Sequence, residues 1–77
     1  MENLEIIDLN GAREALAAIG VSLSAKQLRR AAEPDAHGKR KLPFFVDPID
    51  GRLKINKPSL LKPYFKAAAE AEKHIKN

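Results

Sequence analysis

The chain lacks the residues on which several classes of small protein depend. Among its 77 residues there is no cysteine and no tryptophan, so thiolate metal sites and disulfide frameworks are excluded. No apolar run approaches the roughly 20 residues that span a bilayer, and the acidic start does not resemble a signal peptide. We therefore predict a single domain covering residues 1–77, located in the cytoplasm, with no membrane anchor and a small hydrophobic core.

The sequence motifs of common enzymes are also missing. There is no phosphate-binding loop, dinucleotide fingerprint or nucleophile elbow. The two histidines, His37 and His74, lie far apart in polar surroundings. Asp47 and Asp50 flank a turn, and we interpret them as turn residues rather than as a pair of catalytic carboxylates. The sequence thus predicts a protein that is not an enzyme and uses no metal or cofactor.

Basic residues are present, and they gather in the middle of the chain. The net charge is +4, but residues 25–66 carry eleven basic residues against four acidic ones. By contrast, residues 1–24 carry four acidic residues and a single base, Arg13. A basic segment of this kind suits a polyanionic partner, although an ordinary solvated surface is the alternative.

Two short helices with a tight turn between them are predicted in the first half of the chain. The first runs from about Gly11 to Ile19, begins at a cap formed by Asp8 or Asn10, and ends at Gly20. Its inner face would carry Ala12, Ala15, Leu16 and Ile19. The second runs from Ala25 to about Ala32, with Leu28 inside, and begins at a capping box formed by Ser24 and Gln27.

A two-stranded hairpin and a last helix follow. Residues 42–46 and 52–55 are predicted strands, and Asp50-Gly51 supplies the turn between them. Alternation places Leu53 and Ile55 on the inner face, opposite Phe44 and either Val46 or Phe45. The last helix begins between Asn56 and Pro63. Because proline is tolerated only in the first turn, either the helix starts near Lys62 or it kinks there. Its predicted inner face is Leu61, Tyr64 or Phe65, Ala68 and Ile75.

Two helices joined by a glycine-containing turn favour a helix-turn-helix, in which the second helix contacts DNA. A pair of helices that only pack together is the alternative. Glutamine can read adenine and arginine can read guanine, and a basic hairpin beside the helices can act as a wing. A basic loop triplet can hold phosphate, or can be solvated surface. The candidate DNA-binding residues are Ser24, Lys26, Gln27, Arg29, Arg30, Lys39, Arg40, Lys41, Arg52 and Lys54.

These residues resemble a known family pattern. The pattern comprises Gly20-Val21-Ser22, Leu28-Arg29-Arg30, Leu42-Pro43, Gly51-Arg52, Ile55, and Leu60 or Leu61 with Tyr64. It is similar to the small winged helix-turn-helix proteins of the MerR-like and excisionase-like group over residues 8–66. Residues 24–64 also resemble the pyocin-activator type of phage regulator. The chain departs from the pattern in its long loop, residues 33–41, and in Pro63.

The resemblance implies an α+β, mainly helical fold: a winged helix-turn-helix with a two-stranded hairpin and a C-terminal helix. It implies binding to double-stranded DNA as a transcriptional regulator of a phage or mobile element, or as an accessory factor that bends DNA for an integrase. Recognition would fall on Lys26, Gln27, Arg29 and Arg30, and the wing role on Arg52 and Lys54. Further partners would be a second copy, a recombinase or a polymerase subunit.

Two other functions compete with this prediction. One is a protein-interaction module, for example a phage-encoded inhibitor that binds a host protein through the alanine-rich C-terminal helix. The other is a small DNA-packaging subunit that works as an oligomer.

Overall fold

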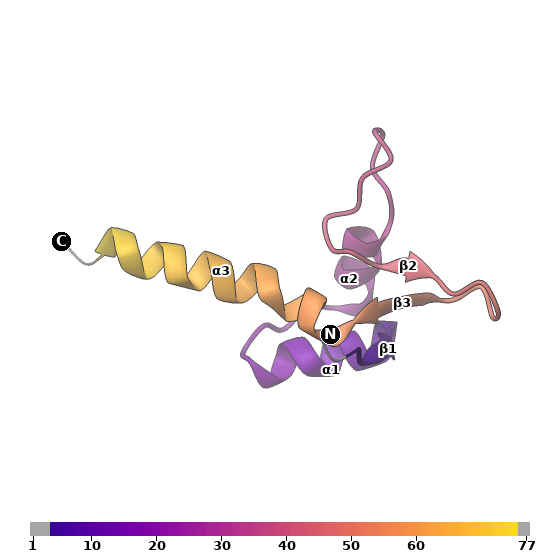
Figure 1. The fold of residues 1–77 in the computed structure, drawn as a ribbon, viewed down its shortest axis with the longest axis horizontal. Helices are drawn as coiled ribbons and strands as arrows, with labels where there is room; N and C mark the ends of the chain where they lie inside the picture. Colours follow the sequence, from indigo (N-terminus) through magenta and orange to yellow (C-terminus); the bar gives the residue numbers. More distant parts are fainter. Residues whose placement is uncertain (1–3, 76–77) are drawn as a thin grey trace.

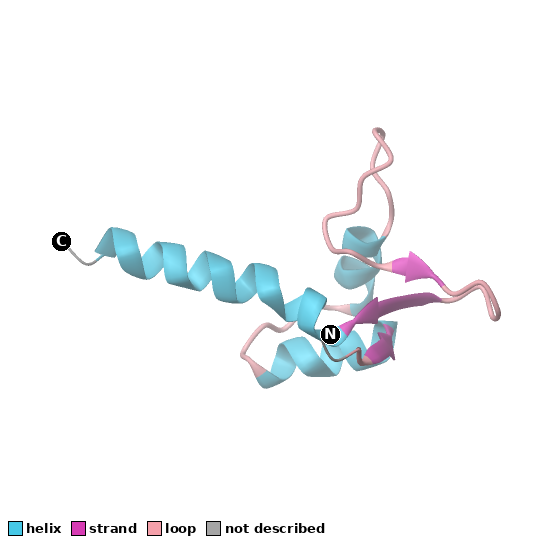
Figure 2. Cartoon of the chain, viewed as in Figure 1, coloured by secondary structure: helices cyan, strands magenta, loops and turns pink. Residues whose placement is uncertain are grey.

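The computed structural model describes residues 4–75, with side chains described through residue 73, and short helices and strands alternate along the chain (Figures 1 and 2). The elements are β1 Ile6–Asp8, α1 Leu9–Ala18, α2 Ala25–Ala32, β2 Phe45–Val46, β3 Leu53–Asn56 and α3 Lys57–Ile75. The predicted α+β class is therefore confirmed over the described residues, as a small fold with three helices and a three-stranded antiparallel sheet.

The first two helices begin and end close to where the sequence predicts. The Asp8 carboxylate accepts a bond from the Gly11 N–H at 2.8 Å, so α1 begins two residues earlier than expected. Gly20 follows α1 with φ at +90°, a conformation that glycine adopts without a steric penalty. In α2 the Gln27 N–H donates to Ser24 Oγ at 3.0 Å, and the Ser24 N–H donates to Gln27 Oε1 at 2.9 Å. The predicted capping box is confirmed.

The sheet contains a strand that the sequence analysis missed. Strand β3 lies in the centre, with β1 and β2 antiparallel on either side. Ile7 lies opposite Ile55, and Val46 lies opposite Leu53. Bonds from the Glu5 N–H to Asn56 Oδ1 and from the Lys57 N–H to the Glu5 carbonyl, each 2.8 Å, extend the β1 pairing to the start of α3. Three residues are too few to show a periodic pattern, so β1 gave no sequence signal.

Strand β2 is shorter than predicted, and its side chains face differently. Leu42 and Phe44 are buried, whereas Phe45 and Val46 are 40% and 51% exposed. The prediction that Phe45 or Val46 faces the core is therefore wrong. Pro43 has no N–H to donate, and the Phe44 N–H donates to the Leu42 carbonyl at 2.7 Å. This tight turn directs the Phe44 side chain inwards and delays the strand to its last two residues.

The core is a single cluster that joins the first two helices, the sheet and the start of α3. Its fully buried large side chains are Leu16, Leu28, Ile55 and Leu60. Leu53 packs against it, so the predicted inward side of β3 is confirmed. The prediction for Ile19 is wrong, because this residue is 38% exposed. It is the C-cap of α1, where the backbone has already left the helical path, so the helical spacing no longer applies to it.

Helix α3 begins at Lys57, at the early end of the predicted range, and projects away from the rest of the molecule (Figure 1). Leu61 and Tyr64 pack against the core, but residues 65–73 are all exposed, so the prediction that Ala68 lies inside is wrong. The helix simply extends past the core. The prediction for Ile75 lies outside the described side chains.

Pro63 is the seventh residue of α3 and lies beyond the first turn, so the predicted alternative in which the helix starts near Lys62 is wrong. Its ring nitrogen cannot donate to the Ser59 carbonyl, so one helical hydrogen bond is lost. Pro63 itself is exposed, which lets water satisfy that carbonyl. Within the described part of the chain, no helix combines the length and the apolar character needed to cross a membrane.

Candidate nucleic-acid interface

The exposed face of α2 is polar and carries no negative charge. Leu28 and Ala32 are fully buried, which fixes the orientation of this helix against the core. At 100° per residue, Arg30 lies opposite the midpoint of these two anchors, and Lys26 lies on the same outer face. Both residues are exposed. The α2 sequence, AKQLRRAA, contains three basic residues and no acidic one, so the helix presents a positive ridge.

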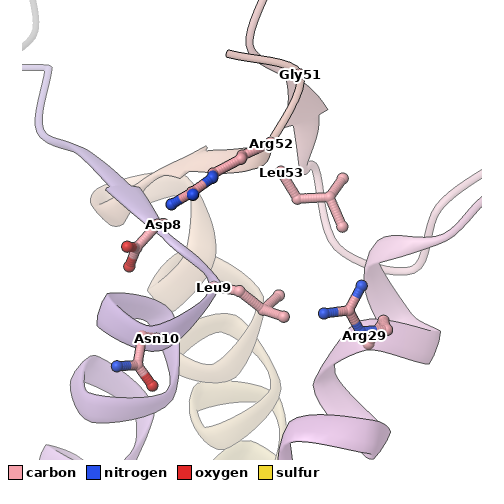
Figure 3. Close-up of a pocket in the computed structure, with 7 residues that line it drawn as sticks. All are labelled: Asp8, Leu9, Asn10, Arg29, Gly51, Arg52 and Leu53. Carbon is pink, nitrogen blue, oxygen red and sulfur yellow. The ribbon is translucent and has the colours of Figure 1, made fainter.

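Arg29 leaves the side of α2 and enters a cleft shared with two other elements (Figure 3). Arg52, which lies at the end of the hairpin turn, extends across the same cleft towards Asp8 at the start of α1. Asp8 is the one acidic residue of the lining, and its carboxylate is already bonded to the Gly11 N–H. The cleft is lined by Asp8, Leu9, Asn10, Arg29, Gly51, Arg52 and Leu53. The fold therefore brings one arginine from α2 and one from the hairpin to a common surface.

Lys54 does not act as the free outward charge that the alternation of the strand predicts. Its ammonium group contacts the Asp47 carboxylate at 2.9 Å and the Asp50 carboxylate at 3.1 Å. Its side chain is only 19% exposed. The turn itself supplies two anions for Lys54, so this lysine needs no anion from outside the protein. Arg52 alone remains an exposed cation of the hairpin.

The two turn aspartates hold the hairpin loop in one conformation. Asp47 accepts a bond from the Ile49 N–H at 2.8 Å, and Asp50 accepts one from the Arg52 N–H at 2.9 Å. These backbone donors, followed by the Lys54 ammonium, lower the pKa of both carboxyls, while the bonds to Asp47 and Asp50 raise the pKa of Lys54. Gly51 has φ at +72° and completes the turn. Asp47 and Asp50 are thus turn residues, as predicted, and also the anchors of Lys54.

The basic triplet in the long loop divides between two roles. Arg40 Nε donates to the Ala32 carbonyl at 2.7 Å and so satisfies the end of α2. Lys39 and Lys41 are exposed on the loop, which extends away beyond α2 (Figure 1). Asp35 closes this loop by accepting the N–H groups of Lys39 and His37, and these bonds lower its pKa. Arg40 therefore stabilises the fold, whereas the two lysines remain available to a ligand.

Gln27 is also occupied within the protein. Its Oε1 accepts the Ser24 N–H, and a bidentate contact to adenine would need that same acceptor together with the amide donor. The Ser24 hydroxyl accepts the Gln27 N–H in return. Both residues thus stabilise and position the start of α2. The side chains of Lys26 and Arg30 are exposed and remain available to bind a ligand.

Sequence reasoning missed the contribution of the N-terminal segment to the cleft. Leu9 and Asn10 line it because β1 pairs with β3 and brings the start of α1 beside the hairpin. The Asp8 cap marks the start of α1 in the sequence, but the run Ile6–Asp8 is too short to predict that it pairs with β3. Among the side chains of residues 4–73, no group of three His, Asp or Glu is placed to hold a metal ion.

No protein-family model, curated protein or solved structure matches this chain. The assignment of function therefore depends on the charge and geometry of the surfaces described above.

Proposed function

We propose that this protein binds double-stranded DNA, with α2 in the major groove and the β2–β3 hairpin beside it as a wing. The observation that supports this best is the cleft in which Arg29 of α2 and Arg52 of the hairpin share one surface. Two guanidinium groups from neighbouring elements suit successive phosphates of a DNA strand, because arginine binds phosphate oxygens through paired N–H donors.

The dimensions of α2 suit this role. It has eight residues, and an α-helix with its side chains is about 10–12 Å across, which matches the roughly 12 Å width of the major groove. Arg30 projects opposite the buried face and is the residue that reaches base edges, where arginine pairs with guanine. Lys26 lies beside Arg30 on the same face of α2. Arg29 and Arg52 bind the phosphate backbone of the DNA. The capping box of Ser24 and Gln27 fixes the start of the helix.

The loop and hairpin have secondary roles in the proposal. Lys39 and Lys41 add phosphate contacts without base selectivity, because they sit on an extended loop. Lys54 stiffens the wing through Asp47 and Asp50 and does not contact DNA. A sequence-specific role in regulation or in recombination, of the type found in phages and mobile elements, is the finer hypothesis that the winged helix-turn-helix resemblance implies.

The test is fluorescence anisotropy of a labelled duplex over a range of salt concentrations. If about five phosphates are neutralised, the logarithm of the association constant falls against the logarithm of salt with a slope of about −4 to −5. Replacing Arg29 and Arg52 together with glutamine makes that slope shallower by about two units. The matched control replaces Lys66 and Lys73 of α3, which removes the same charge far from the cleft and leaves the slope unchanged. A flat salt dependence, or equal effects of both double variants, contradicts the proposal.

A further inference from the structure

Helix α3 continues well past the core that it packs on. It contains 19 residues, about 28 Å, and residues 65–73 are exposed along their whole length (Figure 1). A helical segment of this length is marginal in water unless something packs against it. Within residues 4–73, nothing packs against this segment. The outer half of α3 therefore has no packing partner in the monomer.

An apolar groove lies at the base of the same helix. Its floor is formed by Pro58, Leu61 and Phe65, and Glu5, Lys57 and Lys62 lie around it. The Phe65 side chain is 57% exposed and lies outside the core cluster, so it contributes little to the folded core. Aromatic side chains, phenylalanine among them, are enriched at the centres of protein interfaces.

The apolar line of the groove continues along the projecting helix. Leu61, Phe65, Ala68 or Ala69, and Glu72 follow at intervals of three and four residues, which places them on one face. Between Phe65 and Glu72 this face is made of alanine, whose small side chain lets a second helix approach closely. One helix thus carries both a groove and a slim ridge that fits such a groove.

We propose that a second copy of this chain docks here, with the two α3 helices antiparallel and the two-fold axis near Phe65. In that arrangement the ridge of each copy fills the groove of the other, so both contacts form at once and the assembly closes as a dimer. Ala69 and Glu72 of the second copy then lie over Leu61 and Pro58. The occupant is thereby a second copy rather than an unrelated partner.

Charge complementarity supports this choice. Lys57 and Lys62 line the groove, and at 100° per residue they lie on opposite sides of the line from Leu61 to Phe65. The antiparallel arrangement brings Glu72 of the second copy between them. Glu5 is 3.9 Å from Lys57, a distance that leaves only a weak ion pair within one copy. The interface involves neither α2 nor the arginine cleft, so the proposal stands independently of DNA binding.

The test is sedimentation velocity of the full chain without DNA, from about 10 µM to 1 mM, a range suited to a small interface. We expect a reversible monomer–dimer equilibrium. Phe65→Glu raises the dissociation constant of the dimer about ten-fold or more, because it removes the side chain at the centre of the interface. Its circular dichroism spectrum stays that of the wild type, because Phe65 is not part of the core. Lys66→Glu, which lies away from the contact face, is the matched control and leaves the dissociation constant unchanged.

A charge swap tests the register of the two helices. Lys62→Glu and Glu72→Lys each weaken the dimer about three-fold, as an exposed ion pair does, and the double variant returns to within about two-fold of the wild type. A monomer at every concentration overturns the proposal. A dimer that tolerates Phe65→Glu, or a double variant that shows no recovery, overturns it as well.

Discussion

The capping box of α2 should contribute to stability rather than to base recognition. Ser24→Ala removes the acceptor of the Gln27 N–H, a 3.0 Å bond, and the loss of such a cap costs about 1 kcal/mol. Gln27→Ala removes the 2.9 Å bond to the Ser24 N–H, which costs about 0.5–1 kcal/mol. Each 1 kcal/mol lowers the Tm of a domain of this size by about 4–8 °C. The double variant should lose less than the sum, because both bonds secure the same first turn.

Thermal unfolding followed by circular dichroism measures these losses, and Gln27→Glu provides the control. Glutamate occupies the same place in a capping box, so this variant should keep the wild-type Tm. Its new negative charge at the start of α2 should still weaken binding to duplex DNA. The reasoning is refuted if Gln27→Ala keeps the wild-type Tm while changing which base pair the protein prefers, since Gln27 would then read DNA directly.

Three further outcomes are expected. Arg30→Ala should cost about 1–3 kcal/mol on a preferred duplex and little on random DNA, measured by competition anisotropy, and equal losses on both would make Arg30 a phosphate contact. Lys54→Gln should lower the Tm more than Arg52→Gln, whereas Arg52→Gln should weaken DNA binding more, because Lys54 is bound by two aspartates. The pKa values of Asp47 and Asp50 are lowered from 3.8, so their stabilisation is present above about pH 3.8 and fades as the pH falls through the folded-state values. Acid titration of the Tm should show this loss, and Asp47→Asn should reduce it.

Local signals in the sequence predicted the helices of the first half well. The caps at Asp8 and Ser24 and the stop at Gly20 act within a few residues, so they can be read from neighbouring positions alone. The turn at Gly51 was equally readable, because Asp-Gly favours a positive φ. The buried residues Leu16, Leu28 and Ile55 followed from simple spacing.

The errors lie where contacts within the folded chain decide the outcome. Strand β1 forms only because β3 offers it an edge, and the cleft around Arg29 and Arg52 depends on that pairing. The charge pattern of the hairpin could not reveal that Lys54 folds back onto Asp47 and Asp50. Helical spacing placed Ala68 inside, but spacing does not tell where a core ends along a helix.

The most direct test of DNA binding is NMR titration of the isotope-labelled protein with a short duplex. At 8.5 kDa the chain gives resolved amide signals, so the contacted surface can be mapped residue by residue. The proposal predicts shifts concentrated in residues 24–30 and 51–53, with smaller ones at Lys39 and Lys41 and none in α3 beyond Phe65. An unchanged spectrum at low salt, or shifts confined to α3 and the groove at its base, would contradict it.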